Sequence, residues 1–276
     1  MEFSVLMSVY AKEKAEHLEL ALKSVIEQTK KPDQIVLVKD GLLTDDLERV
    51  ITDYLDKERN LFTIVELKEN KGLGFALNEG IKECKYELVA RMDSDDICVP
   101  ERFEKQIALF LKNPNLDIVG SHINEFEDSV DNIVSIRKVP IIDNSIKSFA
   151  RRRNPFNHVT VIYKKKTVVL SGGYEDFMWF EDYYLWVRMI INDCMCANLD
   201  DQLVNVRAGS PMFERRIGRD YAKMEYLLQK EFLRLKFTNH LRFSANIFTR
   251  ALPRFLPIFW LRKIYLFFAR SNLRNQ

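Results

Sequence analysis

Short apolar runs alternate with segments of helical spacing along the first half of the chain. The runs are typical of buried strands and lie at residues 3–9, 35–38, 62–67 and 86–92. Apolar residues three and four positions apart predict helices at residues 16–28, 44–55 and 75–82. Strands that alternate with helices favour a mostly parallel sheet flanked by helices, so the sequence predicts an α/β fold.

The second half of the chain has a less regular pattern. Further strands are predicted at residues 116–126, 157–163 and 203–207, and further helices from Pro100, at 179–191 and at 220–237. The pattern is weaker over residues 127–150, and residues 209–218 read as a loop. We expect one α/β domain over residues 1–210 and a helical C-terminal extension over residues 211–276.

Basic and aromatic residues are concentrated near the C-terminus. Lys236 to Gln276 contain eight Lys or Arg and no acidic residue. Because the whole chain has a formal charge of +2, a charge of −6 is left for residues 1–235. A basic, aromatic tail behind an acidic body predicts binding to a membrane surface. An ordinary pair of packed helices is the alternative.

The cysteines and the N-terminus bear on localisation. The four cysteines, at positions 84, 98, 194 and 196, form no Cys-x-x-Cys pair, which is typical of free thiols in a reducing compartment. The chain starts with a strand-like run, so no signal peptide is visible, and no apolar run reaches the roughly 18–20 residues of a spanning helix. We expect a cytoplasmic protein that is peripheral at the inner face of the plasma membrane.

Polar side chains follow three of the predicted strands. Ser8 and Tyr10 end the first, Asp40 ends the second, and Asp93 and Asp95 follow the fourth. Parallel sheets bind ligands beyond the carboxyl ends of their strands, so we expect these side chains to converge on one edge.

The acidic cluster Asp93, Asp95 and Asp96 predicts a cation site. Like charges this close repel, and a cation would offset that cost. Two carboxylates make a hard oxygen site suited to Mn²⁺ or Mg²⁺, which usually also take substrate phosphates as ligands. A solvated acidic turn is the alternative.

Three further candidates carry weaker signals. Lys71 precedes Gly72-Leu73-Gly74, a tight turn before a helix that could place Lys71 near phosphate. Glu181 and Asp182 open a helix, where they either complement the helix dipole or serve as ionised functional carboxylates. His158 is more typical of a structural residue than of a catalytic one.

Five motifs in this order resemble those of family 2 glycosyltransferases with the GT-A fold. They are Phe3–Tyr10, Val38–Gly41, Asn70–Gly74, Arg91–Asp96 and Glu181–Arg188. The likeness covers residues 1 to about 207 and is strongest to bacterial enzymes of capsule, O-antigen and exopolysaccharide assembly. Two departures are Lys39, where the family usually has an acidic residue, and Ala11, where asparagine is common.

The resemblance implies inverting transfer of a sugar from a nucleotide-diphosphate donor, UDP- or dTDP-linked, with Mn²⁺ or Mg²⁺. Asp182 would be the general base, with Glu181 beside it near the acceptor. Asp95 would ligate the metal, and Asp93 the metal or the ribose. The donor nucleotide would be bound by Ser8, Tyr10, Asp40, Lys71, Asp93 and Ser94. The acceptor or phosphate side would include His158, Arg188 and Arg215.

The partners implied are a nucleotide-diphosphate sugar, a glycan or polyprenyl-linked acceptor and a membrane surface, without nucleic acid. Two other hypotheses stay open from the sequence. One is a nucleotide-sugar-binding protein without turnover, and the other is a sugar-phosphate nucleotidyltransferase that uses the same metal site.

Overall fold

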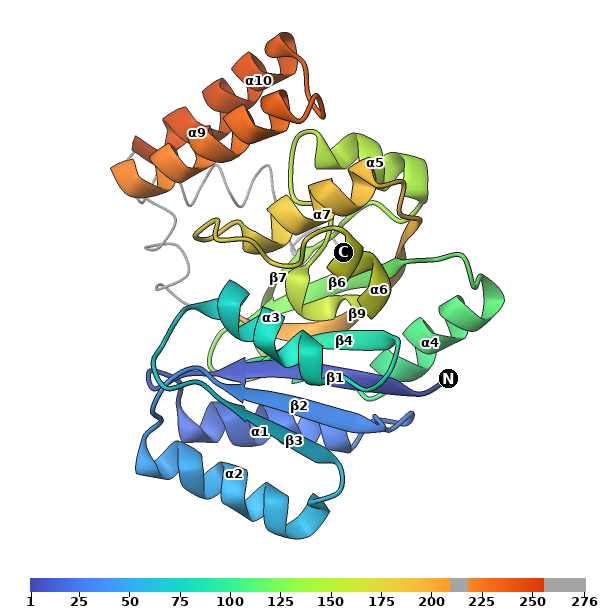
Figure 1. Cartoon of the computed structure of the whole chain (residues 1–276), viewed down its shortest axis with the longest axis vertical. Helices are drawn as coiled ribbons and strands as arrows, with labels where there is room; N and C mark the ends of the chain where they lie inside the picture. The colour runs from blue at the N-terminus through green and yellow to red at the C-terminus, as the bar shows by residue number, and fades with distance from the viewer. Residues whose placement is uncertain (209–217, 256–276) are drawn as a thin grey trace.

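The computed structural model describes residues 1–208 and 218–255, and its N-terminal half is built around four parallel strands. Their order in the sheet is β3 (Phe62–Glu66), β2 (Gln34–Lys39), β1 (Phe3–Val9) and β4 (Leu88–Asp93). The helices between them are α1 (Ala15–Ile26), α2 (Asp45–Glu58) and α3 (Leu73–Glu83). These elements confirm the α/β prediction, and Figure 1 shows them in the lower half of the molecule.

Alternate residues of the central strands enter two separate cores. Val5 and Met7 of β1 pack with α1, whereas Leu6 packs with α3 on the other face. Side chains of a strand point alternately to opposite faces, so a strand covered on both sides is apolar throughout. The close approach of α3 requires Gly80, where an added Cβ would lie 2.3 Å from the Cδ1 atom of Leu6.

The part of the chain that follows β4 adds antiparallel pairs and one parallel pair to this sheet. Its strands are β5 (Ile97–Cys98), β6 (Ile118–Phe126), β7 (Ile133–Arg137), β8 (Ile162–Lys164) and β9 (Cys196–Arg207). From β4 the sheet continues as β8-β6-β9-β5, and β7 pairs with β6. Because β8 is antiparallel to both β4 and β6, the sheet is mixed.

The strand predicted over residues 157–163 is wrong in its first half. His158–Thr160 form a 3₁₀ turn, η1, and the strand β8 begins only at Ile162. The Thr160 N–H and hydroxyl both donate to the Asn157 carbonyl, at 2.9 and 2.8 Å, which closes a turn. The predicted strand at 203–207 is in turn only the end of the longer β9.

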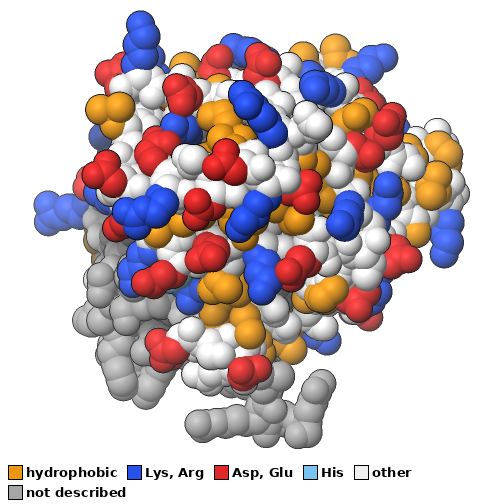
Figure 2. Space-filling view, turned by 90° about the horizontal axis from the view of Figure 1, so that it is seen from below, with side chains coloured by type: hydrophobic (Ala, Val, Ile, Leu, Met, Phe, Trp, Pro, Cys, Tyr) orange, Lys and Arg blue, Asp and Glu red, His pale blue; other side chains and the backbone are white. Residues whose placement is uncertain are grey.

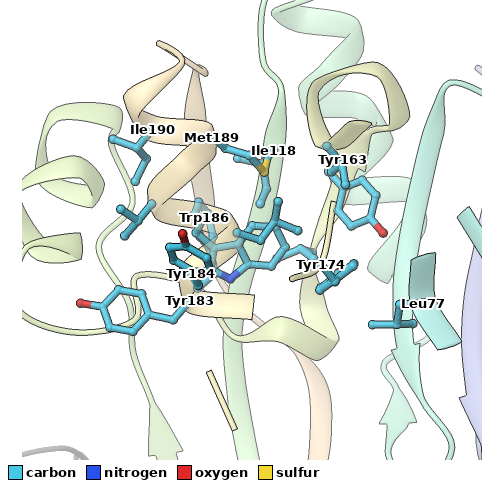
Figure 3. Close-up of a cluster of buried hydrophobic side chains, with 14 of the residues drawn as sticks. Leu77, Ile118, Tyr163, Tyr174, Tyr183, Tyr184, Trp186, Met189 and Ile190 are labelled. Atoms are coloured by element: carbon cyan, nitrogen blue, oxygen red, sulfur yellow. The ribbon is translucent and has the colours of Figure 1, made fainter. Parts of the chain in front are cut away.

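Helices of the second half cover the remaining part of the sheet. They are α4 (Arg102–Lys112), α5 (Asp143–Ala150), α6 (Lys165–Leu170), α7 (Glu181–Ile191), α9 (Arg219–Arg234), α10 (His240–Asn246), the π-helix η2 (Ile247–Ala251) and the 3₁₀ turn η3 (Leu252–Phe255). Trp186 of α7 is fully buried, and Figure 3 shows it between Ile118 and Tyr174. This packing fixes α7 on the sheet.

The described part of the C-terminal extension packs on α5 and α7 (Figure 1). The Tyr184 hydroxyl donates to Glu231 at 3.0 Å, and the Asn246 amide donates to the Arg151 carbonyl at 2.9 Å. Nothing in these contacts tests the expected division near residue 210, which stays a prediction.

The outer surface mixes charges of both signs. Figure 2 shows acidic and basic side chains interspersed on the face that is the lower one in Figure 1. Over residues 1–208 and 218–255, no helix combines the length and the apolar character needed to cross a bilayer.

Candidate functional site

The carboxyl ends of β1, β2 and β4 meet around one cavity of about 430 Å³. Its lining includes the predicted donor-side residues Ser8, Tyr10, Asp40, Asp93, Ser94 and Asp95. Glu13, Asn70, Gly72 and Leu73 complete the described lining. Polar groups from distant parts of the sequence therefore do converge at one edge of the sheet, as expected for a parallel α/β fold.

Asp40 anchors the loop that precedes α3. Its carboxylate accepts hydrogen bonds from the backbone N–H groups of Lys71 at 2.8 Å and Gly72 at 3.1 Å. The loop lies so close to the end of β2 that a Cβ at Gly41, which has a φ of +88°, would lie 2.7 Å from the Asn70 nitrogen. The Lys71 ammonium lies 5.0 Å from the centre of the Phe75 ring. Lys71 thus shapes the site through its backbone.

The acidic cluster after β4 is electrostatically unfavourable by itself. Asp93 is ion-paired with the buried Arg91 guanidinium. Burial, the neighbouring Asp93 and Glu13 raise the pKa of Asp95 to about 7. Burial also raises the pKa of Asp96 well above its ordinary value, although its carboxylate accepts from the Arg207 N–H at 2.9 Å. A bound cation would stabilise the ionised form of Asp95.

The chemistry of this cluster fits Mn²⁺ or Mg²⁺ held jointly by protein and substrate. Asp93 and Asp95 supply carboxylate oxygens, the ligand type that these ions prefer. Within the described part of the chain, no group of three or more His, Cys, Asp or Glu residues could hold a metal ion. Two carboxylates with substrate phosphates as the remaining ligands is the usual arrangement for Mg²⁺.

A second cavity, of about 260 Å³, adjoins the first at Asp93. Its walls come from β6, β7, the segment 153–159, the start of α7, the end of β9 and the C-terminal helices. Its described lining is Asp93, Asp96, Ile123, Glu125, Arg137, Arg153, Asn154, Asn157, His158, Val159, Trp179, Phe180, Asp182, Tyr183, Val206, Tyr221, Arg250 and Arg254. Asp93 and Asp182, predicted to act on opposite sides of the reaction, therefore face the same space.

Two hydrogen bonds hold the Asp182 carboxylate. Its Oδ2 atom accepts from the Asn154 amide at 2.6 Å, and its Oδ1 atom accepts from the Tyr183 N–H at 2.6 Å. Asn154 is oriented in turn because its Oδ1 atom accepts from the Phe156 N–H at 3.2 Å. The first turn of α7 also favours negative charge at this position. Asp182 is thus an oriented acceptor at the cavity wall.

Glu181 occupies a different environment from Asp182. It packs against the first turn of α3, where a Cβ added at Gly74 would lie 3.2 Å from the Glu181 Cγ atom. Burial, with a smaller contribution from Asp182, raises the pKa of Glu181 to about 7. Glu181 therefore connects α7 with α3.

The predicted acceptor-side residues have three different placements. His158 lines the second cavity, and its Nε2 atom lies 3.0 Å from the Tyr174 hydroxyl. Burial and the nearby Arg91 lower the pKa of His158 to about 4, so its imidazole is neutral. The Arg188 guanidinium donates to the Ser171 and Gly173 carbonyls at 2.6 and 2.7 Å, which gives it a structural role in that loop. Arg215 lies outside the described residues.

Several residues of the site have no clear sequence signal. Glu13 follows β1 and accepts from the Ser94 hydroxyl at 3.1 Å. Asn154 lies in a loop, and Trp179 reads from the sequence only as the start of a helix. Tyr221 belongs to a helix that the sequence predicts without a functional role, and Arg254 belongs to the tail that the sequence predicts to bind a membrane surface. Only the tertiary fold brings these side chains to the two cavities.

The α/β fold and the two cavities that share Asp93 are those expected of a glycosyltransferase of the GT-A type, and comparison with known proteins identifies the family. Residues 4–175 match the model for "Glycosyl transferase family 2", so the chain belongs to this family and is a glycosyltransferase. A glycosyltransferase of Haemophilus influenzae is 45% identical over 98% of this chain and 100% of its own length. A UDP-Gal:α-D-GlcNAc-diphosphoundecaprenol β-1,3-galactosyltransferase of Escherichia coli is 37% identical over 96% of this chain and 95% of its own.

A solved structure supports the fold assignment. The mannosyltransferase of Pyrobaculum calidifontis, in complex with GDP-Man and Mn²⁺, superposes with a TM-score of 0.65 at 16% identity. The superposition covers 94% of this chain and 71% of the other. At this identity the likeness establishes the GT-A fold.

Proposed function

We propose that this glycosyltransferase moves a sugar, with inversion, from a UDP- or dTDP-sugar to a hydroxyl of a lipid-linked glycan in cell-surface polysaccharide synthesis. The observation that carries the proposal is that the two cavities share Asp93 as a lining residue, with Asp182 on the wall of the second. The Escherichia coli relative uses a UDP-sugar and a polyprenyl diphosphate acceptor by name, which supports the same substrate classes here.

In this proposal the first cavity binds the donor. Asp40 accepts from the pyrimidine ring, Ser8 and Tyr10 lie beside the nucleoside, and Ser94 lies beside the ribose. Asp95 and Asp93 hold Mn²⁺ or Mg²⁺, which when bound stabilises the negative charge that develops on the departing diphosphate. The Mn²⁺ complex of the Pyrobaculum calidifontis enzyme supports a divalent ion in this role.

Asp182 removes the proton from the attacking hydroxyl. The new bond joins the acceptor oxygen to the anomeric carbon, the bond from that carbon to the diphosphate oxygen breaks, and the proton moves to the carboxylate. The nucleoside diphosphate leaves. Asn154 and the Tyr183 N–H hold the carboxylate in place for this transfer. A positioned base of this kind contributes roughly 10²–10⁴-fold in rate.

The Asp182→Asn variant tests the assignment. With Mn²⁺ and nucleotide sugars, the wild-type protein should transfer sugar and release nucleoside diphosphate, and the variant should lose roughly 10²–10⁴-fold in kcat. The donor should still raise the thermal unfolding midpoint of the variant. The exposed, neighbouring Asp176 offers the matched control Asp176→Asn, which should keep full activity.

Two outcomes would contradict this function. Transfer by Asp182→Asn at the wild-type rate would remove Asp182 from the base role. Nucleotide-sugar binding without turnover by the wild-type protein, with every lipid-linked acceptor supplied, would support the binding-protein hypothesis instead.

We also propose that the C-terminal extension binds the anionic inner face of the plasma membrane. Leu241 of α10 and Phe248 of η2 are 81% and 71% exposed. The tail beyond residue 255, with half of the basic residues behind this proposal, lies outside the described residues. Leu241→Glu with Phe248→Glu should reduce cosedimentation with vesicles that contain phosphatidylglycerol. Unchanged cosedimentation would remove these two side chains from the interface.

A further inference from the structure

The C-terminal helices form part of the wall of the acceptor-side cavity. Tyr221 of α9 and Arg254 of η3 line it together with Trp179, which is separated from the start of α7 by Phe180 alone. The rings of Trp179 and Tyr221 are stacked, with centroids 5.3 Å apart and planes 29° apart. The Arg254 guanidinium carbon lies 4.7 Å from the centre of the Tyr221 ring. These three side chains, the Trp179–Tyr221–Arg254 stack, connect the extension to the cavity that contains Asp182.

Trp179 has two properties that distinguish it from a core residue. Its φ is +69°, a left-handed conformation that is a genuine outlier for a bulky side chain. Its side chain is 38% exposed although it lines the cavity. Strained backbone of this kind persists where surrounding contacts enforce it, and it is concentrated at ligand sites. The stack on Tyr221 supplies such a contact.

An exposed indole ring beside a general base suits a sugar. One face of a pyranose ring carries mainly C–H groups, and these pack on the electron-rich face of an aromatic ring. A sugar that lies on Trp179 would share the cavity with Asp182, which receives the proton of its hydroxyl. This gives the acceptor sugar a defined surface.

Arginines from separate elements surround the same cavity. Arg137 comes from β7, Arg153 from the loop after α5, and Arg254 from η3. A fourth, Arg250, forms a bidentate ion pair with the buried Glu225, at 2.7 and 2.9 Å, and has a structural role. Guanidinium groups match phosphate oxygens with paired hydrogen bonds, which makes arginine the residue suited to diphosphate recognition.

We propose that the Trp179–Tyr221–Arg254 stack is the acceptor subsite, with the acceptor sugar on Trp179 and its anomeric diphosphate bound by Arg254 and Arg153. The proposal rests on the glycosyltransferase function above and deepens it, because it assigns recognition of the diphosphate to the C-terminal extension. A free glycan without phosphate would use only the Trp179 half of this subsite.

Two acceptors that differ only in the diphosphate test the proposal. One is an alkyl diphosphate of α-GlcNAc, and the other is the alkyl α-glycoside of GlcNAc. With the wild-type full-length protein and UDP-sugars, the diphosphate acceptor should have a KM at least about tenfold lower, as expected for hydrogen bonds to a charged group.

The variants separate the two halves of the subsite. Arg254→Ala should raise the KM for the diphosphate acceptor about tenfold and change that for the glycoside much less, and Arg254→Lys should recover part of the loss. Trp179→Ala should raise the KM for both acceptors, whereas Trp179→Phe should stay close to wild type. Arg49→Ala, at an exposed arginine of α2 that lines neither cavity, is the control and should match wild type with both acceptors.

Three results would overturn the subsite. In the first, the wild-type protein does not prefer the diphosphate acceptor or uses neither acceptor. In the second, Arg254→Ala changes the KM for the two acceptors equally. In the third, Trp179→Ala keeps full activity. An equal loss with both acceptors, together with a lower thermal midpoint, would show that Arg254 only supports the fold. Failure of the wild-type protein to release nucleoside diphosphate from any nucleotide sugar would instead refute the proposed function.

Discussion

The buried ion pair between Glu225 and Arg250 should be essential for the stability of the C-terminal extension. The Glu225 side chain is fully buried, and Arg250 forms two hydrogen bonds with it. The Gln229 amide also donates to Glu225 at 3.0 Å. The Arg250→Met variant keeps much of the side-chain volume but leaves a carboxylate buried without its cation. Breaking a buried pair in this way costs about 3–5 kcal/mol.

The measurable consequence is a large fall in the thermal unfolding midpoint. For domains of this size about 1 kcal/mol corresponds to roughly 2–4 °C, so the midpoint should fall on the order of 10 °C at pH 7. Circular dichroism at 222 nm would follow the transition. The pair between the exposed Arg234 and the half-buried Glu231 provides the control. Arg234→Met should change the midpoint little, because the Arg234 guanidinium is in contact with water and its ion pair is screened.

The pH dependence of the effect has a definite sign. Burial alone would raise the pKa of Glu225, but the Arg250 charge and hydrogen bonds lower it below its ordinary value. The pair therefore stabilises the wild-type protein above the unfolded-state pKa, and this contribution is lost as the pH falls through the lower, folded-state pKa. In Arg250→Met, burial dominates and Glu225 takes up a proton. The difference in free energy of unfolding between Arg250→Met and the wild-type protein should therefore become smaller as the pH falls from 7 towards 4.

Two results would refute this reasoning. One is an Arg250→Met midpoint within 2 °C (about 1 kcal/mol) of wild type at pH 7. The other concerns the double variant Glu225→Leu with Arg250→Met, in which neither charge remains. Removing both charges should recover much of the lost stability. A double variant no more stable than the single one would show that packing, and not an unpaired charge, causes the loss.

Three further predictions concern His158, Asp40 and the packing of α3. Burial lowers the pKa of His158 to about 4, so as the pH falls the unfolded chain takes up a proton on this histidine before the folded chain does. The free energy of unfolding, measured with urea, should therefore fall between pH 6.5 and 4 by at most about 3 kcal/mol. Its dependence on pH should be weaker in His158→Asn. Asp40→Asn leaves one N–H of the 71–72 loop without its acceptor, which should cost about 1–3 kcal/mol and raise the donor KM more than it changes kcat. Gly80→Ala places a methyl group in the tightly packed interface between α3 and the sheet, and should lower the free energy of unfolding by about 1–3 kcal/mol in the same urea assay. A variant as stable as the wild-type protein would contradict the close packing of α3.

The sequence by itself determined the parallel part of the sheet and most of the residues that line the first cavity. Continuous apolar strands between amphipathic helices require a covered parallel sheet, and the carboxyl ends of such strands share an edge. Ser8, Asp40 and Asp95 could therefore be brought together from their positions at the ends of the first, second and fourth strands. These predictions are possible because the periodicities of strands and helices, and the residues of turns, can be recognised from positions close together in the sequence.

Only the tertiary structure decided the acceptor side. Asn154 is an ordinary loop residue until the fold places its amide 2.6 Å from Asp182. Tyr221 lies in a predicted helix and Arg254 in the predicted membrane-binding tail, and their place at the cavity depends on contacts between residues far apart in the chain. Contacts of this kind cannot be recognised from sequence periodicity, because they depend on the shape and charge of side chains that are far apart in the chain.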